Sequence, residues 1–197
     1  MASIFTTDQP TKAAIMNTFL QLYATKPLGQ ITVKEISDIC NLSRTTFYSY
    51  FEDTNAVYRA CVYDAINYME IGLSDIVLYT VGCDYDRYVE AFSSHLAGLK
   101  ENLSLYYALL TGSEKDVFRN MWLQSIYTRC GQTLSFSRNL SAAVKDYLVQ
   151  FFAAGQLSIL SSWILSGCKD SAKNIAVTSA QVLFTGVYGS NINNNGK

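Results

Sequence analysis

The chain has 197 residues, of which 49% are hydrophobic and only 16% charged, and its formal net charge is −1 at pH 7. This composition excludes intrinsic disorder over most of the length and provides enough apolar surface for one or two domains with a sizeable core. The charge balance by itself neither favours nor excludes nucleic acid as a partner.

Apolar residues recur at helical spacing along the chain, and no alternating strand pattern persists between turn signals. The spacing therefore predicts an all-α fold. The first apolar stripe contains Ile15, Phe19, Leu22 and Tyr23, and it ends before Pro27. Proline interrupts a helix, so we expect the first helix to stop there.

The next segment carries three helix-start signals at close spacing. Thr32-x-x-Glu35 is a capping box for a short helix, which Asn41 ends. Ser43 can cap a third short helix, and Asp53 can cap a fourth, long one. Asn adopts a positive φ more readily than most residues, which suits a tight turn. Two short helices joined by such a turn predict a helix-turn-helix.

The rest of the chain predicts a second, larger helical body. One of its apolar stripes contains Tyr85, Tyr88, Phe92, Leu96 and Leu99. Ser113-x-x-Asp116 predicts the start of a further helix, and the last two helices are expected near residues 141–167 and 170–189. The polar tail, residues 191–197, is expected to be disordered.

The cysteines are odd in number, widely spaced and without a CxxC pair; they are Cys40, Cys61, Cys83, Cys130 and Cys168. This pattern excludes a disulfide framework and a zinc site. The N-terminus also lacks the basic region and apolar run of a signal peptide. We therefore expect reduced, buried thiols in a cytoplasmic protein.

Helical spacing separates two faces on the third helix. Phe47 and Phe51 are four residues apart and fall on an inner side. The outer side carries Arg44, Thr45, Tyr48 and Ser49. One cation with several hydroxyl groups suits phosphate oxygens and base edges in a DNA major groove. The alternative is a solvated amphipathic helix that contacts nothing.

The segment Ile31–Phe51, ITVKEISDICNLSRTTFYSYF, resembles the DNA-binding signature of the TetR (tetracycline repressor-like) family. The matching residues are Thr32, Ile36, Ser43, Arg44, Thr46, Phe47, Tyr48, Tyr50 and Phe51, with Ile15 and Phe19 in the first helix. The resemblance covers about residues 11–63. It implies an N-terminal helix-turn-helix domain over residues 1–54 and a helical effector-binding and dimerisation domain over residues 55–190.

The resemblance also implies roles for individual residues. The DNA-binding set is Thr32, Lys34, Ser43, Arg44, Thr45, Thr46, Tyr48, Ser49, Tyr50 and Thr54, and the core of the three-helix unit is Ile36, Ile39, Leu42, Phe47 and Phe51. The sequence departs from the family at Thr54, where members usually carry a lysine. Residues 1–60 also hold as many acidic as basic side chains. We therefore expect weak sequence-independent affinity for DNA.

Nothing in the sequence predicts catalysis or a metal site. His95 is the only histidine, and no paired-histidine motif, phosphate loop or nucleophile elbow occurs. We expect no enzyme activity and no cofactor. The aromatic residues of the second body form either a packed core or an apolar pocket for a small, apolar or aromatic effector. The candidate effector-binding residues are His95, Tyr107, Trp122, Tyr127 and Arg129.

No charged residue occurs from Tyr147 to Cys168, a length that suits a membrane span. Because two glutamines and four serines interrupt the segment, we favour a helix buried in a soluble body. Small residues repeat along it at Ala154, Ser158, Ser162 and Ser166. The TetR resemblance implies a dimer built on the last two helices, with Ser158, Ser162, Trp163, Leu183 and Val187 as candidate interface residues.

Together with these patterns, the TetR resemblance implies a homodimeric, cytoplasmic transcription regulator that binds double-stranded DNA at a palindromic operator. We expect a repressor that a small-molecule effector releases from DNA. The alternative is a regulator or activator whose second domain binds a partner protein. A third interpretation is a helical ligand-binding protein with no role on DNA.

Overall fold

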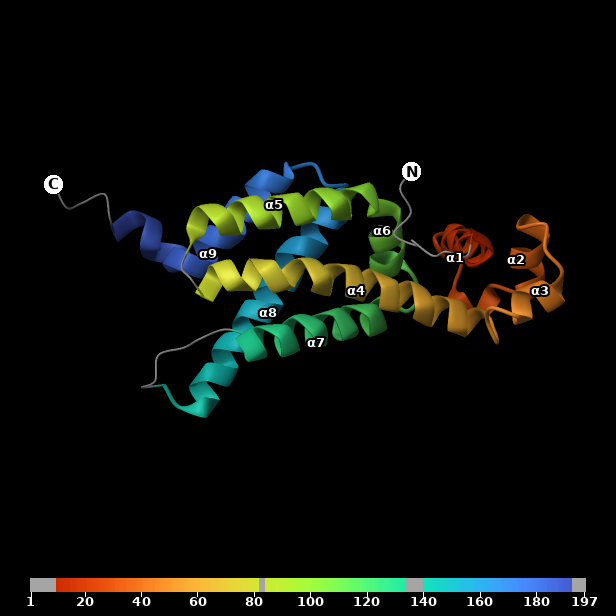
Figure 1. The fold of residues 1–197 in the computed structure, drawn as a ribbon, viewed down its shortest axis with the longest axis horizontal. Helices are drawn as coiled ribbons and strands as arrows, with labels where there is room; N and C mark the ends of the chain where they lie inside the picture. The colour runs from red at the N-terminus through yellow and green to blue at the C-terminus, as the bar shows by residue number, and fades with distance from the viewer. Residues whose placement is uncertain (1–9, 82–83, 134–139, 193–197) are drawn as a thin grey trace. The chain divides into compact units, whose positions relative to one another are not determined.

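The computed structural model describes residues 10–81, 84–133 and 140–192, and it places the side chains of residues 10–70, 84–132 and 140–184. Its described residues form helices and connecting turns and contain no strand, which confirms the predicted all-α class. The helices are α1 (Pro10–Tyr23), η1 (Leu28–Gln30), α2 (Val33–Ile39), α3 (Arg44–Tyr48), α4 (Thr54–Val81), α5 (Tyr85–Glu101), α6 (Leu103–Thr111), α7 (Lys115–Thr133), α8 (Ala142–Leu165) and α9 (Ala172–Ile192) (Figure 1).

The helices pack into two compact units. The first contains the described residues up to Tyr68 together with Asn102–Asn120, and the second contains Met69–Glu101 and the described residues from Met121 onward. The helix-turn-helix segment therefore shares its unit with α6 and the start of α7. This is a division by packing. The predicted division by function, at residue 54, stays a prediction, and most of the predicted tail lies outside the described residues.

Local capping signals fix the ends of the short helices. Thr32 and Glu35 form the predicted capping box at the start of α2. The Ser43 hydroxyl accepts the N–H of Thr46 at 2.9 Å and caps α3. Between these helices the backbone reverses at Asn41, whose φ is 53°. Each of these predictions is confirmed, because the signals involve residues that are near neighbours in sequence.

The core of the first unit contains the inner faces of its helices. Ile15, Phe19, Ile36 and Phe47 are fully buried. Ile39, which the family resemblance placed in this core, is instead 58% exposed. It is the last residue of α2, and the chain turns away immediately after it, so no neighbouring helix covers it.

A turn between α6 and α7 is fastened to α1, η1 and α4 inside the same unit. The Glu114 N–H donates to the Tyr23 phenol oxygen at 2.8 Å, and the Tyr58 hydroxyl donates to the Glu114 carbonyl at 3.2 Å. The Leu28 N–H donates to the Ser113 hydroxyl at 3.1 Å. Ser113 was predicted to cap α7, but α7 begins at Lys115 and the Ser113 oxygen accepts this distant N–H instead.

The second unit is organised by α5 against α9, which lie side by side in Figure 1. The Tyr88 ring packs edge-on against Phe184, with 5.5 Å between centroids. A buried hydrogen bond joins α9 to α8, in which the Ser179 hydroxyl donates to the Gln156 side-chain oxygen at 2.8 Å. Trp122 is completely buried. The aromatic residues at these positions therefore pack a core, which was one of the two interpretations left open.

The charge-free helix α8 is long and apolar enough to cross a membrane by length and composition, and 44% of its most apolar stretch is buried inside the protein. Its packed side includes Val149, Ala153, Leu157, Leu160 and Ile164. The remaining side is exposed and partly apolar. A single such helix is weak evidence for a membrane span, because the core helix of a soluble protein has the same composition.

Candidate functional sites

Helix α3 has a buried inner side and an exposed outer side, as predicted. Phe47 is fully buried, and its ring lies 6.1 Å from that of Phe51 and 5.7 Å from that of Tyr48. Tyr48 is 56% exposed, and Arg44 and Thr45 are exposed beside it. The packed phenylalanine ring therefore holds the helix while the cation and hydroxyl groups point into solvent.

Three of the predicted DNA-contacting hydroxyl groups already have partners inside the helix. The Ser43 and Thr46 hydroxyls share a hydrogen bond of 2.8 Å, and the Ser49 hydroxyl donates to the Thr46 carbonyl at 2.7 Å. In the described part of the chain, Arg44 and Thr45 make no such bond. These two residues and Tyr48 are consequently the groups on α3 best placed to reach another molecule.

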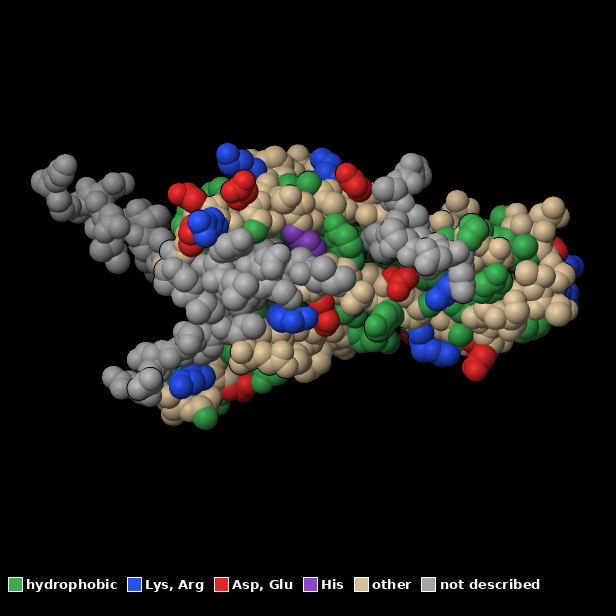
Figure 2. Space-filling model, viewed as in Figure 1, with side chains coloured by type: hydrophobic (Ala, Val, Ile, Leu, Met, Phe, Trp, Pro, Cys, Tyr) green, Lys and Arg blue, Asp and Glu red, His purple; other side chains and the backbone are tan. Residues whose placement is uncertain are grey.

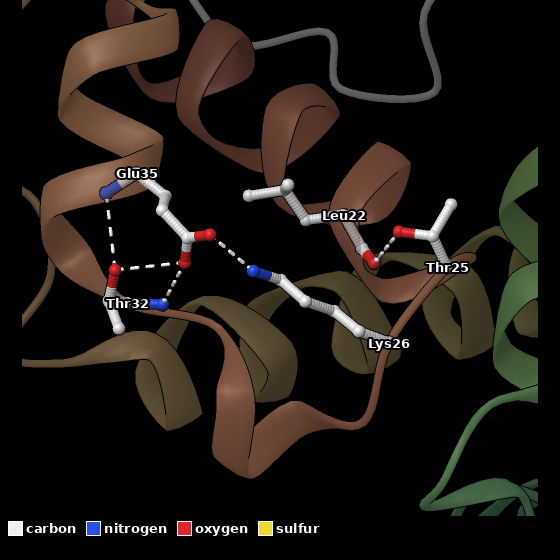
Figure 3. A network of polar contacts seen from close by, with 5 residues as sticks. All are labelled: Leu22, Thr25, Lys26, Thr32 and Glu35. Carbon is white, nitrogen blue, oxygen red and sulfur yellow. Dashed lines mark hydrogen bonds and ion pairs between the residues drawn. The ribbon is translucent and has the colours of Figure 1, made fainter.

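A network of polar contacts surrounds the start of α2 (Figure 3). The Thr32 hydroxyl accepts the Glu35 N–H at 3.2 Å and donates to Glu35 Oε2 at 2.9 Å. The second Glu35 oxygen pairs with the Lys26 ammonium. The Lys26 ammonium, followed by the Thr32 contacts, lowers the pKa of Glu35 to about 2. The Thr32 hydroxyl therefore already donates a hydrogen bond to Glu35. It can donate to a phosphate only when this bond is broken.

The other predicted DNA-contacting residues flank these helices. Lys34 is exposed on α2, while Tyr50 and Thr54 are half-buried around the start of α4. Asp53 caps that helix by accepting the Ala56 N–H at 2.7 Å. The position at which family members usually carry a lysine therefore offers a partly covered hydroxyl group beside a carboxylate.

Few cations of the helix-turn-helix segment are available to a polyanion. Lys26 is paired with Glu35, and the Lys12 ammonium lies 5.9 Å from the centre of the Phe51 ring. This leaves Lys34, Arg44 and Arg59 among the basic residues between positions 10 and 60. On the face shown in Figure 2, basic and acidic side chains are interspersed and form no single-sign field.

The candidate effector residues are not gathered in one cavity. Tyr107 is 46% exposed in the first unit, whereas Trp122 is buried in the core of the second. The Tyr127 hydroxyl donates to Asp146, and Arg129 lies 3.6 Å from the Glu70 carboxylate. His95 is half-buried, and burial lowers its pKa to about 4, so it is neutral at pH 7.

Of the candidate effector residues, Tyr127 does line a hollow. An open groove of about 580 Å³ lies between α7 and α8, with Leu123, Gln124, Tyr127, Tyr147, Gln150, Phe151, Ala153 and Ala154 around it. Tyr127 also lines a second groove of about 450 Å³, which includes Asp146 and Lys145. The grooves combine aromatic rings with amide and hydroxyl tips. Sequence reasoning missed Tyr147 and Phe151, since it placed this segment in a buried helix.

The exposed side of α8 is a candidate contact surface, which we call the α8 face: Val144, Leu148, Phe151, Gly155, Ser158, Ser162 and Leu165. The spacing alternates between four and three residues, as in helices that pack along a shared seam. Phe151 is 70% exposed. The predicted small residues Ser158 and Ser162 lie on this face. The helical spacing of its larger apolar members could have identified those residues from the sequence.

The other predicted interface residues are not members of the α8 face. Leu183 lines an apolar groove of about 290 Å³ between α8 and α9, next to Leu148 and Phe151. Trp163 is buried, and its indole N–H donates to the Asp170 carbonyl at 2.9 Å, so it does not reach the α8 face. The side chain of Val187 lies outside the described residues.

Comparison with solved structures shows the same fold in known regulators. The dihydroxyacetone kinase operon activator DhaS superposes with a TM-score of 0.55 at 19% identity, covering 88% of this chain and 93% of that one. The fatty acid degradation regulator FadR from Bacillus halodurans superposes with a TM-score of 0.60 at 15% identity, covering 93% and 99%. No curated protein matches the sequence.

Residues 87–184 match a family model, TetR_C_8, described as a transcriptional regulator C-terminal region. With an N-terminal helix-turn-helix and this C-terminal region, the fold defines a helical transcription regulator. The chain belongs to the TetR family of transcriptional regulators. Members of this family bind DNA and usually act as dimers, are generally cytoplasmic, and are typically not enzymes.

Proposed function

We propose that this regulator is a homodimeric repressor that reads a palindromic operator with α3 and leaves DNA when a small apolar or aromatic effector binds. The observation that carries the DNA-reading role is the division of α3. Phe47 is locked in the core, while Arg44, Thr45 and Tyr48 are presented to solvent, and the Arg44 and Thr45 side chains make no hydrogen bond within the described part of the chain. A short helix after a tight turn is the element that enters a major groove.

The α8 face supports the proposed dimer. Its apolar side chains, including Val144, Leu148 and Leu165, are each about two-fifths exposed, and Phe151 is more so. Exposed apolar side chains in a contiguous row on a helix favour association. A two-fold axis through this face would present two α3 helices, and half-sites one helical turn apart suit that symmetry.

The groove between α7 and α8 supports the proposed effector. Aromatic side chains and two glutamines line it, and a flat organic molecule with one or two polar groups fits such a lining. Release from DNA requires that the effector bind the DNA-free conformation more tightly than the DNA-bound one, since equal affinity shifts no equilibrium.

The alternative is a regulator whose second unit binds a protein. The exposed rings of Tyr147 and Phe151 favour it, because aromatic anchors dominate protein interfaces. The similar structure DhaS carries the name of an operon activator. Under this alternative the chain would activate transcription by contact and would need no small effector.

The first experiment is a selection of duplex DNA from a random-sequence pool, followed by binding measurements with the enriched duplex. We expect a sequence with two-fold symmetry and binding by a dimer. Enrichment of no sequence would contradict operator recognition. Aromatic compounds that bind the α7/α8 groove are then added; if every such compound leaves operator affinity unchanged, the partner-protein alternative replaces the effector.

A further inference from the structure

One cation of the helix-turn-helix segment is held by a carboxylate that also holds a hydroxyl group. Glu35 pairs with the Lys26 ammonium through Oε1, and its Oε2 accepts the Thr32 N–H at 3.0 Å and the Thr32 hydroxyl at 2.9 Å (Figure 3). Lys26 is fixed at its backbone, because its N–H donates to the Leu22 carbonyl at 3.0 Å. Glu35 therefore occupies three donors at once, of which two, the Lys26 ammonium and the Thr32 hydroxyl, belong to side chains.

These donors are of the kind that contacts phosphate. Ammonium and hydroxyl groups supply many of the protein's hydrogen bonds to DNA phosphates. The Lys26 and Glu35 side chains are 22% and 41% exposed, so solvent and an incoming anion reach both. Glu35 is ionised at physiological pH, and Lys26 and Thr32 lower its pKa further, from 4.5 to about 2. A carboxylate and a phosphate accept hydrogen bonds from the same donors.

We propose that Glu35 competes with the DNA phosphates for Lys26 and Thr32, and thereby limits the strength and the salt dependence of DNA binding. The inference rests on the proposed function, since it requires the start of α2 to lie along the DNA backbone as Thr32 in the family signature implies. Glu35 is a positioning residue that acts through Lys26. Thr54 supplies no cation at the start of α4. Because few cations are then available to phosphates, holding back Lys26 should have a large effect on phosphate binding.

The test compares Glu35→Gln with the wild type on two probes, a mixed-sequence duplex and the operator duplex obtained by selection. Glutamine forms the same capping box with threonine, but it carries no charge. We expect the slope of log affinity against log salt to steepen by about 0.9, which corresponds to about eightfold tighter binding at 0.1 M salt relative to 1 M salt. The gain should be equal on both probes, since phosphates carry no sequence.

Two further variants separate competition from general charge effects. Asp38→Asn removes an exposed carboxylate from the same helix but frees no cation, so its slope should equal that of the wild type. Lys26→Gln combined with Glu35→Gln should abolish the steepening. An unchanged slope in Glu35→Gln, a slope equal to that of Asp38→Asn, or a steepening that persists without Lys26 would each overturn the inference.

The remaining outcomes are also decisive. If Glu35→Gln does not fold, by circular dichroism and thermal melting, Lys26→Gln alone carries the test. We expect it to weaken binding to both duplexes, because the unpaired Glu35 then repels phosphate, and wild-type affinity would overturn the inference. If the wild type binds neither duplex at low salt, the proposed function fails; if the wild type binds and the variants do not differ, only the competition fails.

Discussion

The Tyr23 phenol oxygen accepts the backbone N–H of Glu114 at 2.8 Å, although the two residues are 91 positions apart in sequence. Gly112, two residues before Glu114, lies close to the same tyrosine ring. A Cβ atom built on Gly112 would be 2.4 Å from the Tyr23 ring. The end of α1 and the turn between α6 and α7 therefore form one closely packed contact in the first unit.

Gly112→Ala should destabilise the protein by about 1–3 kcal/mol, as overpacking of a filled site does. The backbone at Gly112, with φ −68° and ψ 179°, is open to alanine, so the effect comes from the Tyr23 ring alone. The matched control is Gly29→Ala, where no atom lies within 4 Å of the added Cβ. Urea unfolding measures both variants, and equal stability of the two would contradict the close approach.

Arg44→Ala and Tyr48→Ala should each weaken operator binding by about 1–3 kcal/mol while leaving the fold intact, since both side chains are exposed and Phe47 holds the helix. Arg87→Ala, which removes an exposed cation from the second unit, is the control and should bind as the wild type does. Fluorescence anisotropy with the selected duplex measures all three. Wild-type affinity in both α3 variants would remove α3 from the DNA interface.

Ser162→Glu should convert the proposed dimer into monomers or insoluble protein, because it would bury an unpaired charge on the α8 face. Ser94→Glu, at an exposed position on α5, is the control and should leave assembly unchanged. Sedimentation velocity distinguishes the species. An intact dimer of Ser162→Glu would show that the copies associate through another surface.

Glu35 should stabilise the folded state in a defined pH window. Its pKa is lowered from 4.5 to about 2, so its contribution is fully present above about pH 4.5 and is lost as the pH falls toward 2. The pKa of Asp64 is raised by burial and acts in the opposite sense, but it is common to wild type and variant. The difference in unfolding free energy between wild type and Glu35→Gln should therefore shrink across this window, and a pH-independent difference would contradict the assignment.

Local sequence signals predicted the helix-turn-helix well, because each depends on a few neighbouring residues. The Thr32 capping box, the Ser43 cap and the turn at Asn41 all involve partners within a few positions. Ser113 is an exception to this success. Its hydroxyl could either cap α7 or accept an N–H from a distant residue, and in the structure it accepts the N–H of Leu28, 85 residues away. Periodicity contains no information about such a partner.

The candidate sites of the second unit were harder to predict for a related reason. A row of apolar residues on α8 indicates that the helix is covered on several sides, but it does not say whether the same chain supplies the cover. Trp163 is covered within the unit, and Phe151 is not. Likewise, Arg129 and Tyr127 are polar residues in an aromatic region, yet each is bound to a neighbouring carboxylate rather than directed at a common cavity.

The burial of Trp122 has a spectroscopic consequence. The chain has two tryptophans, Trp122 and Trp163; both belong to the second unit and both are shielded from water. Tryptophan emission during denaturation therefore reports the opening of that unit alone, whereas far-ultraviolet circular dichroism follows the helices of both. Coincident curves would mean that the two units unfold as one cooperative block. Emission that changes after part of the helical signal is lost would mean that the first unit melts first, while the second remains folded.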